Sequence, residues 1–462
     1  MATQSSPPVT LLVLGAGGDL TRRLLLPGLA TLLSTERDRR VRVVGADRAE
    51  LSAAEWTSRV EGAFAQVQAP KAVTGRVVKH TEYVRSDILD PDSLGALVEG
   101  CGDGPLVVFF ALPPSVTTRC CALLADLRLP EVTRLALEKP FGTDLASARD
   151  LNALLHRVVP EERVFRIDHF LGVNTVLNLV GTRFANRIFQ PVWSRDHIER
   201  VEIVYDEDLA LEGRAGYYDG AGALRDMLQS HLLQVLALFA MESVTTLDSE
   251  EVQDQKAQVL RAVRPWGRSA ARSARRARYT AGTIGRRKIP DYTSEEGVDP
   301  ARKTETLAQM TVAVENNRWA GVPFVLRSGK GMGEPRKEIV VTFRDVAHLP
   351  GGFQGAEGPD RLVIGLKPGS MELSMTMNAE GDPFDLEQKT LSATLAPPRM
   401  HAYGEVLGQI LDGERLLSVR GDSAEECWRI VAPVLRAFAQ DKVPMEEYPA
   451  GSSGPDGWLP SA

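Results

Sequence analysis

The chain has 462 residues, of which 43% are hydrophobic and 25% are charged, and its formal net charge is −7. This length and composition predict a globular protein with large cores and about two or three domains. The acidic balance excludes a general nucleic-acid binder, because such proteins present a net basic domain to the phosphate backbone. We therefore expect small molecules and further copies of the chain as partners.

The cysteines and the N-terminus both favour a cytoplasmic protein. Cys101, Cys120, Cys121 and Cys427 are far apart or directly adjacent, so they form neither a CxxC metal pair nor a disulfide framework. The opening MATQSSPPVT lacks the positive region of a signal peptide. The longest apolar stretch, residues 105–114, is about half of the ~20 residues that a spanning helix needs, so we expect no membrane segment.

Short apolar runs alternate with helical stretches in the first part of the chain. The runs are VTLLVLG at 9–15, VRVVGA at 41–46, PLVVFFA at 105–111 and TRLALEKP at 133–140. This alternation is typical of a parallel sheet with crossover helices. Residues 1–175 are therefore predicted to form a Rossmann-type, doubly wound domain that binds its ligand beyond the carboxyl ends of the strands.

The sequence GAGGDL directly follows the first run and opens a helix. Gly15, Gly17 and Gly18 remove the side chains that would keep a pyrophosphate away from the backbone amides, and a helix N-terminus favours an anion. We expect this turn, with Asp19 and Leu20, to bind a dinucleotide. A glycine-rich turn without a ligand is the alternative.

Asp47 and Arg48 stand at the end of the second apolar run. An acidic residue here accepts hydrogen bonds from the ribose of NAD, whereas an arginine pairs with the additional phosphate of NADP. The two neighbouring residues therefore favour different cofactors. We expect NADP or dual use, because Arg48 can both stack on adenine and bind phosphate.

Beyond residue 193 the pattern changes to apolar and polar residues in alternation, as in half-buried antiparallel strands. Such segments are 199–207, 308–316, 337–345, 360–368 and 371–379. Residues 176–462 are thus predicted to form an α+β domain. Helices at 222–241 and 400–411 are expected to cover one face of its sheet. The stretch 261–288 carries many arginines and no acidic residue, so a solvated surface loop is expected there.

Five sequence blocks carry a resemblance to a known family. They are EKPFGTDL from Glu138, RIDHFLG from Arg166, EGRAGYYD from Glu212, LRDMLQSHLLQ from Leu224 and GVPFVLRSGK from Gly321. In order and spacing they resemble the glucose-6-phosphate dehydrogenases, over nearly the whole chain. The resemblance implies an NAD(P)-dependent enzyme that oxidises C1 of a glucose-type sugar to a lactone, as a dimer or tetramer and without a metal.

The resemblance also implies roles for individual residues. His231 matches the general base that takes the proton of the C1 hydroxyl, and Asp168 matches the carboxylate that orients its ring. A carboxylate on one ring nitrogen fixes the tautomer and stabilises the imidazolium. Taken alone, His231 on an apolar helix would be assigned as a core histidine. The positions matched to substrate-binding residues are Lys139 (beside both sugar and cofactor), His169, Glu212, Asp226 and Lys330.

Departures from the family pattern cluster at the residues that hold the 6-phosphate. Where the family has a tyrosine and a lysine, this chain has Phe170 and Val173. A cation that the family carries later in the chain aligns with Pro335, and Arg336 is the next residue. Leu24 stands at a further position where the family has a lysine. Each charge-assisted donor contributes roughly 1.5–3 kcal/mol. These losses lead to the hypothesis that the preferred sugar lacks a phosphate at C6.

Three alternatives stay open. The first is an ordinary glucose-6-phosphate 1-dehydrogenase of the pentose phosphate pathway, with phosphate contacts from the basic stretch 261–288. The second is the wider group of sugar dehydrogenases that also carry EKP, which leaves RIDHFLG and QSHLLQ unexplained. The third is a non-catalytic homologue, which the presence of Asp168, His231 and Lys139 disfavours.

Overall fold

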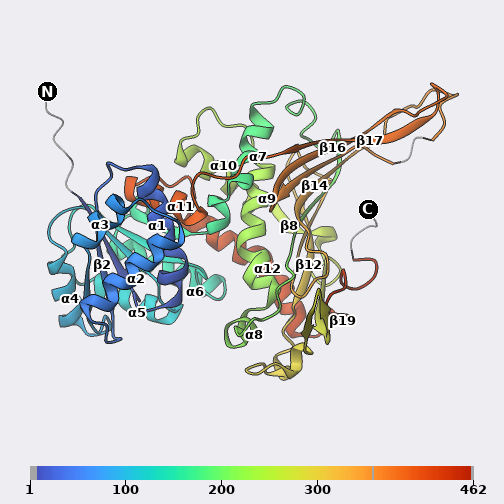
Figure 1. Ribbon diagram of the computed structural model, residues 1–462. Coiled ribbons are helices and arrows are strands. Elements are labelled where there is room, and N and C mark those ends of the chain that lie inside the picture. Colours follow the sequence, from blue (N-terminus) through green and yellow to red (C-terminus); the bar gives the residue numbers. More distant parts are fainter. Residues whose placement is uncertain (1–7, 356–357, 459–462) are drawn as a thin grey trace, which may run out of the picture. The chain divides into compact units, whose positions relative to one another are not determined.

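The computed structural model describes residues 8–355 and 358–458 (Figure 1). Its contacts divide the chain into two compact units. The first unit contains the described residues up to Asn174 together with Val244–Asp254 and Pro398–Glu425, and the second contains the remainder. The first unit thus takes in two segments that the sequence-based boundary at residue 175 places in the second domain. No helix in these described ranges is long and apolar enough to cross a membrane.

The first unit is built on a seven-stranded sheet in the order β18-β6-β5-β4-β1-β2-β3. All neighbours are parallel except β18, which runs antiparallel to β6. The strands are β1 (Val9–Leu14), β2 (Val41–Asp47), β3 (Glu82–Arg85), β4 (Leu106–Phe110), β5 (Thr133–Glu138), β6 (Val164–Ile167) and β18 (Ser418–Val419). The predicted apolar runs correspond to β1, β2, β4 and β5, and they are nearly continuously buried because helices cover both faces of a parallel sheet.

The strand order reverses at β1, which pairs with β2 on one side and β4 on the other. Such a switch point opens a crevice at the carboxyl ends of the strands, where doubly wound folds bind ligands. The accompanying helices are α1 (Leu26–Thr35), α2 (Ala53–Gln66), α3 (Lys71–Lys79), α4 (Pro91–Gly100), α5 (Pro114–Leu124), α6 (Leu145–Val158) and α11 (Ala402–Asp412). The Rossmann-type prediction is therefore confirmed.

Helix α11 corrects one expectation. We expected the helix at 400–411 to cover the sheet of the second domain, but α11 belongs to the first unit and packs against α1. Two glycines allow this approach: a Cβ at Gly28 would lie 2.6 Å from Cβ of Tyr403, and one at Gly404 would lie 2.6 Å from Oγ1 of Thr31. The helix pattern was readable in the sequence, whereas its packing partner was not.

The second unit contains a ten-stranded, mostly antiparallel sheet. Its order is β17-β16-β15-β14-β7-β13-β12-β9-β19, and β8 pairs with β12. The strands are β7 (Ile198–Asp206), β8 (Val263–Pro265), β9 (Ala274–Thr280), β12 (Leu307–Val314), β13 (Pro323–Gly329), β14 (Lys337–Phe343), β15 (Arg361–Leu366), β16 (Gly369–Asn378), β17 (Leu386–Thr394) and β19 (Met445–Pro449). The α+β prediction is confirmed.

The helical part of the second unit begins with α7 (Asn174–Phe184), whose first residue still belongs to the first unit. The predicted helix at 222–241 consists of a π-helical stretch, Leu224–Leu232, followed by α9 (Leu233–Ala240). Helix α8 (Ala215–Ala223) precedes it, and Gly222 interrupts the helical geometry at their junction. The long helices α10 (Ser249–Ala262) and α12 (Gly421–Ala439) complete the set and extend across the boundary between the two units.

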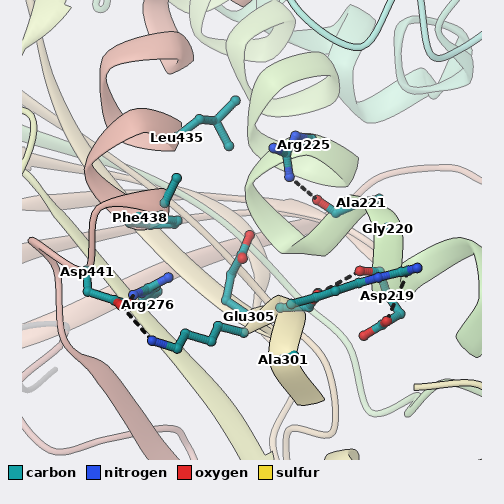
Figure 2. Close-up of a pocket in the computed structure, with 14 residues that line it drawn as sticks. Asp219, Gly220, Ala221, Arg225, Arg276, Ala301, Glu305, Leu435, Phe438 and Asp441 are labelled. Carbon is teal, nitrogen blue, oxygen red and sulfur yellow. Dashed lines mark hydrogen bonds and ion pairs between the residues drawn. The ribbon is translucent and has the colours of Figure 1, made fainter. Parts of the chain in front are cut away.

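The basic stretch 261–288 is not the solvated loop that we expected. It contains β8, β9 and β10 (Gly282–Ile284), and β9 is an interior strand of the large sheet. Arg276 is only 3% exposed and pairs with Asp441 at 3.0 Å. Figure 2 shows the two side chains next to each other. Arg275 pairs with Glu446 at 3.1 Å. The neutralising carboxylates come from a segment about 165 residues later in the chain, so local composition could not reveal them.

Candidate active site

The glycine turn connects β1 to a π-helical turn, Thr21–Leu25, that leads into α1. Gly15 has a φ of 85°, and a Cβ there would lie 2.3 Å from the carbonyl oxygen of Ala111, directly after β4. Both the left-handed backbone and the close approach require glycine. The amide of Gly18 closes the turn by donating to the carbonyl of Gly15 at 3.0 Å. The turn thus leaves bare backbone at the switch point of the sheet, which suits a pyrophosphate.

Asp47 supports this turn from the end of β2. Its carboxylate accepts hydrogen bonds from the amide of Gly17 at 2.9 Å and from the amide of Ala49 at 3.2 Å. Arg59 on α2 donates to the carbonyls of Ala16 and Gly17, at 3.1 and 2.8 Å. Arg59 could not be predicted from the sequence, since an arginine on an amphipathic helix gives no signal that it will reach a turn 42 residues earlier.

A cavity of about 270 Å³ brings four predicted cofactor residues together: Gly15, Gly18, Asp47 and Arg48. Arg48 is exposed and has no ion pair among residues 8–355 and 358–458. Three elements that sequence analysis did not include also line this cavity, namely the turn after β3, the segment after β4 and the start of α5. A bare backbone cradle, an acid and an unpaired cation together fit a dinucleotide.

The remaining two residues of the GAGGDL motif are less directly involved. Asp19 forms ion pairs with Arg22 and Arg23, both at 3.2 Å, on the exposed side of the helix start. Leu20 lies directly before the π-helical turn. Within the described residues, neither Asp19 nor Leu20 lines the cavity at the glycine turn.

Lys139 and Asp168 follow two neighbouring parallel strands at the same edge of the first sheet. Glu138, the last residue of β5, pairs in register with Ile167, the last residue of β6. The residues directly after them, Lys139 and Asp168, therefore emerge side by side at the ligand-binding edge. Asp168 is 1% exposed and caps the short 3₁₀-helix His169–Gly172 by accepting a hydrogen bond from the amide of Phe170 at 3.0 Å.

Two polar groups behind this edge, Glu138 and Tyr403, were not among the predicted site residues. The Tyr403 hydroxyl donates to the carboxyl of Glu138 at 2.9 Å, and the Tyr403 ring stacks on His169 with 6.2 Å between centroids. Burial raises the pKa of Glu138 to about 7, against the lowering effects of the Tyr403 hydrogen bond and the Lys139 charge. Glu138 belongs to the EKP block, so its sequence motif could have indicated it as a site residue. Tyr403 lies 265 residues away in the chain, so no local motif connects it to this edge.

In the second unit, two predicted site residues lie on the π-helical stretch Leu224–Leu232. Asp226 accepts a hydrogen bond from the Tyr217 hydroxyl at 3.2 Å, and His231 is 1% exposed. Because a π-helix bonds residue i to residue i+5, Asp226 and His231 lie one turn apart. Single π-helical turns occur frequently at functional sites.

Glu212 and Lys330 are both engaged in ion pairs within the second unit. Glu212 has a left-handed backbone, with a φ of 48°, and its carboxylate pairs with Arg287 at 2.6 Å. Lys330 pairs with Glu207 at 2.7 Å and lies over the ring of Tyr218, 5.2 Å from its centroid. Both side chains therefore have defined positions in the unit.

The residues that replace the family's phosphate ligands are apolar or already paired. Phe170 is 6% exposed and makes an edge-on contact with the ring of His169. Arg336 pairs with Glu338 at 2.6 Å and lies 3.8 Å from Glu202. A guanidinium held by two carboxylates is a weaker phosphate ligand than an unpaired one.

A nucleotide-binding sheet with a glycine turn at its switch point, joined to a large α+β unit, defines an NAD(P)-dependent oxidoreductase. Residues 12–178 match the model for the glucose-6-phosphate dehydrogenase NAD binding domain, and residues 180–458 match the model for the C-terminal domain of the same family. The chain belongs to the glucose-6-phosphate dehydrogenase family. It is accordingly an oxidoreductase that acts on a CH–OH group with a nicotinamide cofactor, and the wider EKP group is not its family.

Relatives of this family are similar to the chain over nearly its full length. The chain is 37% identical to a glucose-6-phosphate 1-dehydrogenase of Gluconobacter oxydans, covering 98% of this chain and 96% of the relative. It is 36% identical to that of Mycolicibacterium smegmatis, covering 97% and 94%. A solved glucose-6-phosphate 1-dehydrogenase from Mycobacterium avium matches with a TM-score of 0.84 at 31% identity, covering 97% and 96%.

A second solved structure is described as glucose-6-phosphate dehydrogenase in complex with its substrate glucose-6-phosphate. It matches with a TM-score of 0.88 at 29% identity and covers 99% of this chain and 97% of its own. These relatives favour the ordinary glucose-6-phosphate 1-dehydrogenase over our hypothesis of a sugar without a 6-phosphate.

Proposed function

We propose that this enzyme oxidises C1 of glucose 6-phosphate to the 1,5-lactone, with NADP⁺ as hydride acceptor. The observation that carries the proposal is the pair Lys139 and Asp168, which emerge side by side at the ligand-binding edge of the nucleotide-binding sheet. Relatives of known name match this chain over nearly its full length, which supports the same reaction. We also propose a cytoplasmic dimer or tetramer and a domain boundary near residue 175, on the family resemblance.

The proposed mechanism assigns a role to each site residue on the family resemblance. His231 takes the proton from the C1 hydroxyl while the C1–H bond breaks and its electron pair leaves as hydride. On the same resemblance, Asp168 is assigned to orient the imidazole of the base and to stabilise the imidazolium that forms. When bound, the cofactor supplies the electrophilic ring that accepts the hydride. Glu212 and Asp226 bind sugar hydroxyls, and Lys139 and Lys330 bind the substrate.

The preference for NADP rests on Asp47 and Arg48. The Asp47 carboxylate is already engaged by the backbone amides of Gly17 and Ala49, so less of it is available to a ribose hydroxyl. Arg48 has no ion pair within the described part of the chain and lines the same cavity. An unpaired arginine at this place is the group that recognises a 2′-phosphate.

A second candidate substrate is a glucopyranose without a phosphate at C6. Phe170 is buried where the family has a hydroxyl donor, Val173 replaces a cation, and Arg336 is held by Glu338. A pocket with fewer charged donors binds a dianion less tightly, because the desolvation of the phosphate is compensated less. Under this alternative the C1 chemistry and its residues stay the same.

A substrate panel tests the proposal. Cofactor reduction is followed at constant enzyme with glucose 6-phosphate, glucose, and glucoses with an amino or other neutral group at C6. The proposal expects the highest kcat/KM for glucose 6-phosphate. A higher kcat/KM for a sugar without the phosphate replaces it with the second candidate, and no turnover of any of these sugars refutes both.

A further inference from the structure

A second cavity, of about 630 Å³, lies in the first unit away from the cofactor turn. It is lined by Val41 and Arg42, the first residues of β2, and by the end of α3 with its cap residue His80 (Figure 1 labels α3 and β2). Asp47 and the glycine turn lie at the opposite end of β2 and β1. Seven residues of strand separate the two ends, which is roughly 20 Å. The cavity is therefore distinct from the cofactor site.

The lining is strongly basic. We call this cavity the basic pocket. Its single lining carboxylate is Glu82, and the cations that line it are Arg39, Arg40, Arg42, Arg76 and Lys79. The whole protein has a net charge of −7, so this concentration of positive charge runs against the overall balance. A concave surface lined by one sign of charge focuses its field on a ligand of the opposite sign.

Ion pairs within the unit neutralise only part of this charge. Arg39 pairs with Asp412 at 2.8 Å, and Arg42 pairs with Glu82. Arg40, Arg76 and Lys79 have no ion pair among residues 8–355 and 358–458. Three cations therefore face the cavity without a counter-charge from the described residues.

Arg76 gives an independent indication of a missing ligand. Its Nη2 atom is buried and has no hydrogen-bond partner in the described part of the chain. A buried donor without a partner costs about 1–3 kcal/mol, and more when it is charged. An anion bound in the cavity would accept from this guanidinium and remove that cost.

Helix dipoles explain only part of the arrangement. Arg76 and Lys79 lie in the last turn of α3, where a cation gains roughly 0.3–1 kcal/mol from the partial negative charge of the helix end. Arg40 and Arg42 lie before and at the start of a strand, where no such effect operates. The helix dipole therefore does not explain why these four cations line one cavity.

We propose that the basic pocket is a second ligand site, which binds an oligophosphate group carried by a nucleotide or by inorganic pyrophosphate. Three unpaired cations match the charge of two or more linked phosphates. The volume is within the range of about 300–1,000 Å³ for small-molecule sites. Leu33, Val41 and Val77 also line the cavity but are only 1–8% exposed, so polar and charged side chains make up most of its accessible surface.

The test is a binding titration of the full chain with ATP and, separately, with pyrophosphate, both with NADP⁺ just sufficient to fill the cofactor site, because excess NADP⁺ carries a pyrophosphate that would compete for the basic pocket. The double variant Arg76→Ala, Lys79→Ala removes two of the unpaired cations. A matched control, Lys71→Ala with Arg128→Ala, removes the same charge from exposed residues of the same unit that do not line the cavity. Lys79→Glu, at an exposed position, is a second variant that leaves the partly buried Arg76 intact.

The proposal expects saturable binding that weakens about tenfold or more in the double variant and in Lys79→Glu, and by less than about twofold in the control. Binding of pyrophosphate as tight as that of ATP identifies the phosphate chain as the recognised group, and binding of ATP alone identifies a nucleotide. The proposal is overturned by an absence of saturable binding of both probes, or by equal weakening in the double variant and the control.

Discussion

Arg48→Ala should shift the enzyme from the proposed preference for NADP⁺ toward equal use of both cofactors. Arg48 lines the cavity at the glycine turn, is exposed, and has no ion pair among residues 8–355 and 358–458. Its neighbour Asp47 is held by the amides of Gly17 and Ala49, and neither bond involves the guanidinium. The substitution should therefore remove the phosphate contact without loosening the turn.

The expected change in KM follows from the solvent exposure of Arg48. A charge-assisted hydrogen bond contributes about 1.5–3 kcal/mol, and solvent screening at an exposed site places this contact at about 1–2 kcal/mol. That range corresponds to a rise of about 5- to 30-fold in the KM for NADP⁺. NAD⁺ has no 2′-phosphate, so its KM should change by less than about threefold.

The assay is steady-state cofactor reduction with each cofactor varied at saturating sugar. Arg37→Ala serves as the control, because Arg37 is an exposed arginine of the same unit that lies outside the cofactor cavity. It should leave both KM values unchanged. Equal effects of Arg48→Ala on NADP⁺ and NAD⁺, or no effect on either, would refute the assignment of Arg48 to the 2′-phosphate.

Three further predictions concern the remaining parts of the site. His231→Asn should lower kcat by about 10²- to 10⁴-fold while cofactor binding is retained, because the substitution removes the proposed general base and leaves the residues of the dinucleotide turn unchanged. The double change Phe170→Tyr, Val173→Lys should raise kcat/KM for glucose 6-phosphate by about tenfold or more and leave that for glucose unchanged, since two phosphate donors are restored. Glu138 keeps its proton in the native state until about pH 7, whereas the unfolded chain releases it near the ordinary value of a glutamate, so its ionisation destabilises the native state as pH rises between these values. Glu138→Gln should accordingly raise Tm relative to the wild type by more at pH 8 than at pH 5.

Each of these has a result that counts against it. A His231→Asn enzyme with near-normal kcat at neutral pH would make His231 a structural histidine. Equal gains for glucose and glucose 6-phosphate in the double variant would show that positions 170 and 173 do not contact the phosphate. A Tm difference for Glu138→Gln that is the same at both pH values would show that Glu138 ionises normally in the native protein.

The first unit could be predicted well because its strands carry their signal locally. β1, β2, β4 and β5 are continuous apolar runs that a doubly wound sheet buries on both faces. β3 (Glu82–Arg85) was missed since it is a short edge strand with half-exposed or exposed side chains. β18 was missed as well, because two residues from position 418 give no periodic pattern.

Long-range partners account for the other differences. The arginines of 261–288 suggested a solvated loop, but Asp441 and Glu446 neutralise them within the sheet. Tyr403 reaches Glu138 from α11, a helix that we expected to cover the larger sheet and that packs against α1 instead. The site residues themselves came from the family resemblance, since a histidine on an apolar helix has no local feature that distinguishes a base from a core residue.

The central claim, hydride transfer from C1 to the cofactor, is tested most directly with glucose 6-phosphate that carries deuterium at C1. The account predicts that the reduced NADP contains one deuterium per turnover and that the sugar product is the lactone or its hydrolysed acid. Reduced cofactor without deuterium, or deuterium retained in the sugar product, would contradict it.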